Sequence, residues 1–151
     1  MKERDVSKIV GIMIHHSASE YGNADTIRQW HTSAPRNWDD IGYNDVILNC
    51  YPTYEHYRSC NPDMDSDGVC EDGREIQYVP AGAKGYNTNW IHICLIGNGT
   101  FSSAQLDRLQ EVVGYYKFKY PTIQKVLRHC DVNDRKPDCP SLSSKFLREL
   151  L

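Results

Sequence analysis

The sequence Ile-Val-Gly-Ile-Met-Ile-His-His at residues 9–16 decides how this chain folds. Its apolar side chains do not alternate with polar ones, which is typical of a strand that is buried on both faces. We therefore predict a strand over residues 8–14, inside a sheet that helices cover. His15 then stands at the carboxyl end of this strand, where side chains from neighbouring strands can reach it.

Two capping patterns predict helices. Asn23 or Asp25 can cap a first helix, because both side chains accept hydrogen bonds from the free amides of a first turn. Ser102 and Gln105 form a capping-box pattern, and apolar residues at helical spacing follow over residues 106–116. This second pattern is the clearest helix signal in the chain.

The remaining segments complete an α/β pattern. Residues 50–73 have neither helical nor strand periodicity, and we predict that they form a long surface loop insertion. A last helix is expected after a cap at Ser141. Loose alternation of strands and helices favours a single domain over residues 1–151, with one central sheet flanked by about three main helices. Further strands are predicted over residues 45–48, 75–79, 90–96 and 125–127.

Composition limits the classes of partner. The chain has 151 residues, 40% of them hydrophobic, which suits one domain with a real core. A net charge of -3 and a pI near 6.0 give no electrostatic reason for binding nucleic acid or an anionic membrane, so neither partner is expected. The first apolar run is too short for a secretory signal, so we expect a cytoplasmic protein. In that compartment its six cysteines favour metal binding or burial over disulfides.

Three residues far apart in the sequence can form a metal site. His15 ends the first predicted strand, His129 ends a later one, and Cys139 lies in a loop between Pro137 and Pro140. Two imidazoles and one thiolate make a Zn²⁺ shell with one tetrahedral position left over, which is typical of catalytic rather than structural zinc. Such an ion activates water and polarises a carbonyl, so the set predicts a metal-dependent hydrolase. The alternatives are two packed histidines and a buried cysteine that acts as a small apolar residue.

Seven short segments together resemble the zinc-dependent N-acetylmuramoyl-L-alanine amidases, the family that includes amidase-type phage lysozymes and peptidoglycan recognition proteins. The segments follow the order found in the family and span nearly the whole chain. The resemblance implies the mixed central sheet of that family. The segments are Ile-His-His-Ser-Ala-Ser (14–19), Ile-Arg-Gln-Trp-His (27–31), Ile-Gly-Tyr-Asn (41–44), Ala-Lys-Gly-Tyr-Asn (83–87), Ile-Cys-Leu-Ile-Gly (93–97), His-Cys-Asp-Val (129–132) and Asp-Cys-Pro (138–140).

The resemblance implies roles for the metal and for one tyrosine. His15, His129 and Cys139 become the ligands of one Zn²⁺ per chain. Tyr43 matches a family tyrosine near the metal, where its phenol would donate a hydrogen bond to the developing oxyanion. The alternative for Tyr43 is a residue that is only packed at the start of a strand.

Lys136 resembles a family lysine that stabilises the negative charge of the tetrahedral intermediate. It lies three residues before Cys139, whereas the family pattern has two. Either Asp138 replaces Cys139 as the third ligand, or the loop carries one extra residue. The Cys-Pro pair favours Cys139. Arg135 is a lesser substitute for Lys136, and a solvated charged loop is the alternative for all of these residues.

Two departures from the family pattern change what we expect of the site. Some members carry a glutamate where this chain has Cys94, so the acid–base work would fall on Tyr43 and Lys136. The turn before residues 84–87 often bears a histidine in the family, but Gly82 stands there, so one contact is expected to be missing. Three further cysteines are open to a disulfide, a second metal or free thiols, namely Cys50, Cys60 and Cys70.

The resemblance implies an enzyme that hydrolyses the amide between the lactyl group of muramic acid and L-alanine in peptidoglycan. We expect a monomeric phage-type endolysin that stays cytoplasmic until it is released to the cell wall. One alternative is a cytosolic amidase that recycles muropeptides. The other is a recognition module that binds peptidoglycan without cutting it.

Overall fold

A computed structural model of the chain describes residues 1–150, and its centre is the strand that the first motif predicts. β1 (Gly11–His16) is buried along all six residues. It lies in a five-stranded sheet of order β3-β2-β4-β1-β5, in which β2, β4, β1 and β5 are parallel and β3 is antiparallel. The sheet is therefore mixed, as predicted. The other strands are β2 (Asp45–Ile47), β3 (Cys70–Asp72), β4 (Trp90–Leu95) and β5 (Lys125–Arg128).

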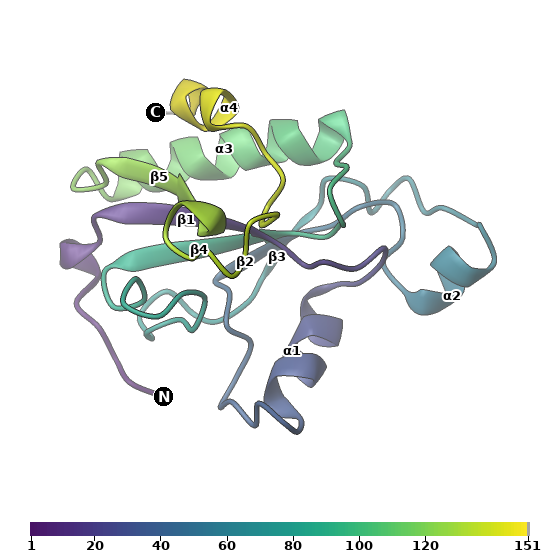
Figure 1. The fold of residues 1–151 in the computed structure, drawn as a ribbon, viewed down its shortest axis with the longest axis horizontal. Coiled ribbons are helices and arrows are strands. Elements are labelled where there is room, and N and C mark those ends of the chain that lie inside the picture. Colours follow the sequence, from purple (N-terminus) through teal and green to yellow (C-terminus); the bar gives the residue numbers. More distant parts are fainter. Residues whose placement is uncertain (151) are drawn as a thin grey trace.

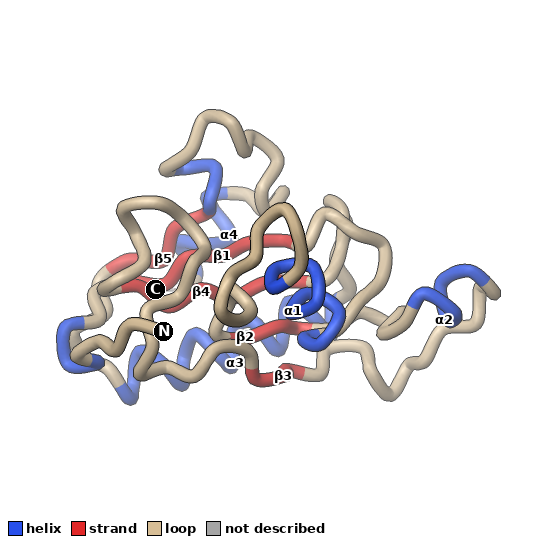
Figure 2. The backbone as a smooth tube through the Cα atoms, turned by 90° about the horizontal axis from the view of Figure 1, so that it is seen from below, coloured by secondary structure: helices blue, strands red, loops and turns tan. Residues whose placement is uncertain are grey.

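Helices cover both faces of the sheet. Figure 1 shows α3 and α4 on one face and α1 on the other, and in the turned view of Figure 2 α1 lies in front of the strands. Within residues 1–150, no helix has both the length and the apolar character that crossing a bilayer requires. The helices are α1 (Ala24–Thr32), α2 (Tyr54–Arg58), α3 (Ser103–Lys119) and α4 (Ser144–Glu149), with short 3-10 turns η1 (Val6–Lys8) and η2 (His129–Asp131).

The packing of the core explains why apolar and polar side chains do not alternate along β1. Ile12 and Ile14 pack in one cluster with Leu109 and Val113 of α3. Met13, the residue between the two isoleucines, packs on the opposite face against Ala83 and Trp90. Since successive side chains of a strand point to opposite faces, a sheet covered on both sides demands apolar residues at every position.

The helix caps follow the sequence with one exception. The side chain of Asn23 accepts from the amide of Thr26, and Ser102 with Gln105 forms the expected capping box. The prediction for Ser141 is wrong, because its backbone has φ 70° and its hydroxyl donates to the Asp138 carbonyl. Ser143 caps α4 instead.

The region after β2 differs most from the prediction. The predicted strand over residues 75–79 is wrong, since Tyr78 forms only an isolated bridge with Glu3. Its place at the edge of the sheet is taken by β3, which pairs with β2. Both β3 and α2 lie within residues 50–73, which the sequence predicted as loop. Neither element is long enough to show a periodicity.

Gly114 offers a test of the α3 assignment. It lies on the exposed side of α3, and a Cβ placed there meets no atom within 4 Å. Gly114→Ala should therefore raise the free energy of unfolding by about 0.5–1 kcal/mol, since alanine loses less backbone entropy in a helix. Urea denaturation measures this change. Gly11→Ala is the control with the opposite sign, because its Cβ would lie 2.4 Å from the Trp90 ring; a destabilising Gly114→Ala would contradict the helix.

Candidate metal centre

Parallel pairing brings the two predicted histidine ligands together. β1 and β5 are neighbours in the sheet, and their register pairs Ile14 with Arg128. His15 and His129 are the next residues of the two strands at the same carboxyl edge, and their ring centroids lie 4.6 Å apart. The sequence prediction that these histidines meet at one edge is therefore confirmed.

The loop after β5 returns Cys139 to the same edge. The amide of Cys130 donates to the Cys139 carbonyl at 2.9 Å, which fixes the end of the loop against η2. At the start of η2, the guanidinium of Arg128 donates to the Asp131 carboxylate at 2.6 Å. The loop therefore holds the cysteine through its backbone, and the position of the thiol does not depend on a flexible side-chain contact.

The three donor atoms fit a tetrahedral metal ion. One ligand atom each from His15, His129 and Cys139 lie within 4.8 Å of one another, and these residues form the one such cluster among residues 1–150. His15 Nδ1 and Cys139 Sγ are 4.0 Å apart. Nitrogen and sulfur at usual zinc bond lengths and a tetrahedral angle would be about 3.6 Å apart. Two imidazoles and a thiol are the donors that zinc prefers, so the residues fit the ion in kind and in spacing.

Burial sets the protonation of these donors. It lowers the pKa of His15 well below 6.5, and neighbouring histidines lower it further. It also lowers the pKa of His129, with Lys136 adding to the effect. Both imidazoles are therefore neutral, which leaves a lone pair for a metal. Burial raises the pKa of the Cys139 thiol to about 11, although the backbone of His16 donates to it. A divalent cation reverses this preference, because it attracts the thiolate.

His92 fixes the orientation of His15, a feature that the sequence analysis missed. His92 Nε2 lies 2.7 Å from the Tyr86 carbonyl, and a carbonyl only accepts, so this nitrogen carries the proton. His92 Nδ1 must then accept from His15 Nε2, 2.7 Å away. This leaves the Nδ1 lone pair of His15 toward Cys139, as a metal ligand requires. Burial lowers the pKa of His92 to about 3, which keeps the imidazole neutral.

The side chain of His92 occupies the space that a side chain at Gly82 would need. A Cβ on Gly82 would lie 2.1 Å from His92 Nδ1, far inside contact distance. His92 of β4 fills the space above the glycine, but it is fully buried and does not line the cleft. A sequence signal existed, since His92 is a polar residue in an otherwise apolar strand.

Tyr43 lies beside the three donors. Its ring centroid is 4.9 Å from that of His15 and 5.4 Å from that of His31. His31 Nδ1 accepts from the Gly42 amide at 2.9 Å, and the amide of Arg74 donates to the Tyr43 carbonyl at 2.7 Å. The backbone on both sides of the tyrosine is thus held. Burial raises the pKa of Tyr43 well above 10, so the phenol stays protonated and can donate.

A cleft of about 520 Å³ opens over the donors. Lys136 and Arg135 also line it, and Lys136 is close enough to His129 to lower its pKa. Asp138 also lines the cleft, but the cluster of ligand atoms contains Cys139 and not Asp138. His16 lines the wall, and its buried Nδ1 has no hydrogen-bond partner within the protein.

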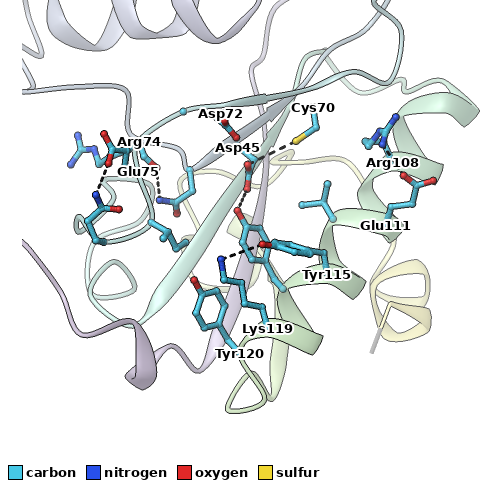
Figure 3. A pocket seen from close by; sticks show the side chains of 16 residues that line it. Asp45, Cys70, Asp72, Arg74, Glu75, Arg108, Glu111, Tyr115, Lys119 and Tyr120 are labelled. Atoms are coloured by element: carbon cyan, nitrogen blue, oxygen red, sulfur yellow. Dashed lines mark hydrogen bonds and ion pairs between the residues drawn. The ribbon is translucent and has the colours of Figure 1, made fainter.

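A larger cavity of about 620 Å³ lies between β3 and α3, and Figure 3 shows its side chains. Several of its polar groups bond to one another. Lys119 Nζ donates to the Tyr115 hydroxyl at 3.2 Å, and the Tyr116 hydroxyl donates to Asp45. Within residues 1–150, this cavity contains no cluster of metal-binding side chains. The chemistry therefore points to the smaller cleft.

Comparison with known families matches residues 5–141 to the family described as N-acetylmuramoyl-L-alanine amidase. The chain belongs to that family. The endolysin of Enterobacteria phage T3 is 32% identical over 146 residues, covering 89% of this chain and 82% of that endolysin. The solved structure of N-acetylmuramoyl-L-alanine amidase LysC from Clostridium intestinale has a TM-score of 0.72 at 23% identity, covering 99% of this chain and 90% of its own. The solved structure of Drosophila PGRP-LB has a TM-score of 0.69 at 23% identity, covering 99% of this chain and 82% of its own.

The amidase contains further cysteines outside the cleft. Cys50, Cys60 and Cys70 are free thiols, so none of them joins the insertion as a disulfide. Among residues 1–150 they form no second metal cluster. Cys94 is fully buried beside Tyr43 and raises the pKa of that phenol, so it offers no acid–base group to the cleft.

The contact between Gly82 and His92 predicts that the effects of substitutions at these two positions on stability depend on each other. Gly82→Ala should lower the free energy of unfolding by about 1–3 kcal/mol, since the new methyl group must displace the His92 ring. In a His92→Ala background the same change should cost much less, because the ring is gone. Urea denaturation with a chelator present measures all four proteins. Equal costs in both backgrounds would contradict this contact.

Proposed function

We propose that this amidase is zinc-dependent and hydrolyses the amide between the lactyl group of muramic acid and L-alanine in peptidoglycan. The observation that carries the proposal is the three-donor cluster under the cleft. One Zn²⁺ per chain would be held by His15, His129 and Cys139. When bound, zinc lowers the pKa of water and polarises the scissile carbonyl.

The chain's own residues supply the remaining steps. Tyr43, protonated and held by its backbone, donates a hydrogen bond to the oxygen that becomes negative as the amide carbonyl is attacked. Lys136, at the rim, adds positive charge to the same side of the cleft. His92 keeps the donor nitrogen of His15 in place through the whole reaction.

We further propose that the enzyme acts as an endolysin, a monomeric single domain that is cytoplasmic until it reaches the wall at lysis. Support comes from the endolysin of phage T3, to which the chain is similar along most of both lengths. A recognition module that only binds peptidoglycan is less favoured, since the cleft retains all three donors. Offering intact sacculi and soluble muropeptides to the purified protein distinguishes an endolysin, which cuts sacculi, from an amidase that recycles muropeptides.

The first test joins metal content to wall hydrolysis. Zinc-loaded protein should release L-alanine amino termini from isolated sacculi, and a chelator should stop the release until zinc is restored. His15→Ala and His129→Ala should fold but bind far less than one zinc per chain by elemental analysis. His56→Ala, which changes a histidine of α2 that does not line the cleft, is the matched control and should keep its zinc.

The third ligand is tested in the same assay. Cys139→Ser should weaken zinc binding but not abolish it, whereas Asp138→Ala should keep one zinc per chain. The reverse pattern would show that Asp138 is the ligand. Zinc-loaded wild type that binds sacculi without releasing any L-alanine amino terminus would favour the recognition module.

Tyr43→Phe separates catalysis from metal binding. The variant should keep normal zinc, because the phenol is not among the clustered donors. Its kcat should fall by about 10²–10³, the usual effect of removing one donor to an oxyanion. Steady-state hydrolysis of a soluble muramoyl peptide measures this effect, and unchanged turnover would remove Tyr43 from the mechanism.

A further inference from the structure

Four aromatic side chains form an exposed surface next to the cleft, which we call the aromatic ledge: Tyr21, Trp30, Tyr54 and Tyr57. Trp30, Tyr54 and Tyr57 are 38%, 53% and 39% exposed. The Tyr21 ring links them, with centroids 6.3 Å from Trp30, 5.4 Å from Tyr54 and 5.9 Å from Tyr57. Contiguous exposed apolar surface of this kind usually marks a binding site.

The ledge is tied to the rest of the protein by hydrogen bonds, although α2 contributes no buried residue to the core. None of the five residues of α2 is buried, and Figure 1 shows α2 projecting beyond the sheet. The segments on either side are tied together by hydrogen bonds. The Gly22 amide donates to the Tyr51 carbonyl at 3.0 Å, and Asn23 Nδ2 donates to the Pro52 carbonyl at 2.8 Å. A surface held in this way loses little conformational entropy when a ligand binds.

The ledge is continuous with the cleft through one residue. Trp30 lines the cleft wall together with His129 and Cys139, and it also contacts Tyr21 at the start of the ledge. A chain-like ligand whose reacting bond lies over the metal donors can therefore run along the ledge without leaving the protein surface. The rim formed by Arg135 and Lys136 has a different chemistry, since it is cationic.

We propose that the aromatic ledge binds the glycan strand of peptidoglycan, on the sugar side of the amide that the cleft holds. This inference rests on the proposed function. A pyranose ring presents axial C–H groups on a flat face and hydroxyls at its edge, which matches indole and phenol rings with apolar faces and polar edges. The ledge side chains bear no formal charge, so the neutral sugars suit them better than the charged stem peptide does.

The test uses Tyr54→Ala/Tyr57→Ala, because both rings lie on a helix without buried residues and outside the cleft. The holoenzyme variant should bind peptide-free glycan strands about tenfold more weakly than wild type in calorimetry. Its KM on sacculi should rise by about the same factor, with kcat unchanged. Hydrolysis of a soluble monomeric muramoyl peptide, which has no strand to reach the ledge, should stay at the wild-type rate.

The matched control is Tyr115→Ala/Phe118→Ala, which removes two exposed rings from α3. It should behave as wild type with both substrates. Wild-type affinity of the ledge variant for glycan strands and unchanged KM on sacculi would overturn the proposal, as would a change in self-association alone, since the ledge would then bind a second copy. If the wild-type protein cuts neither substrate, the proposed function fails. The affinity for glycan strands measured by calorimetry still tests whether the aromatic ledge binds them.

Discussion

The structure depends on the burial of β1 between two parallel neighbours. Parallel strands place their carboxyl ends at one edge of the sheet, and a one-residue slip would turn every side chain of β1 to the other face. Such a slip would move Ile12 and Ile14 away from Leu109 and Val113 and would turn His15 away from His129 in the same step. The hydrophobic core therefore fixes the geometry of the metal donors, since the interactions that hold the register also set the spacing of His15 and His129.

The pair formed by Gly82 and His92 shows how a glycine in a turn makes room for a buried histidine of a neighbouring strand. The space above Gly82 can hold a side chain from the turn or one from β4, but not both. In this chain β4 supplies it, and the imidazole also accepts from His15. A strand residue is held by ladder hydrogen bonds on both sides, so the orientation of His15 is set by the sheet rather than by a loop.

Sequence reasoning predicted the parts of the molecule in which one local pattern decides the outcome. Continuous apolar runs identified β1 and β4, the capping box identified α3, and strand ends at His15 and His129 predicted where the ligands meet. The short elements α2 and β3 were missed, since three or five residues cannot display a period. The strand expected over residues 75–79 was wrong because β3 already pairs with the edge of β2. The role of His92 depends on a contact 77 residues distant in sequence, which no local pattern reports.

Within the insertion over residues 50–73, α2 contributes no buried residue to the core. A helix of five residues is far below the length that forms alone in water, so α2 must be ordered by contacts made elsewhere. Those contacts are between aromatic rings, which remain partly in solvent and gain less from burial than the same rings would in the core. Hydrogen bonds between residues 20–23 and residues 49–52 then hold the rings beside Tyr21. A helix that adds no buried residue to the core and is yet held in place is better explained by what the enzyme binds than by how it folds.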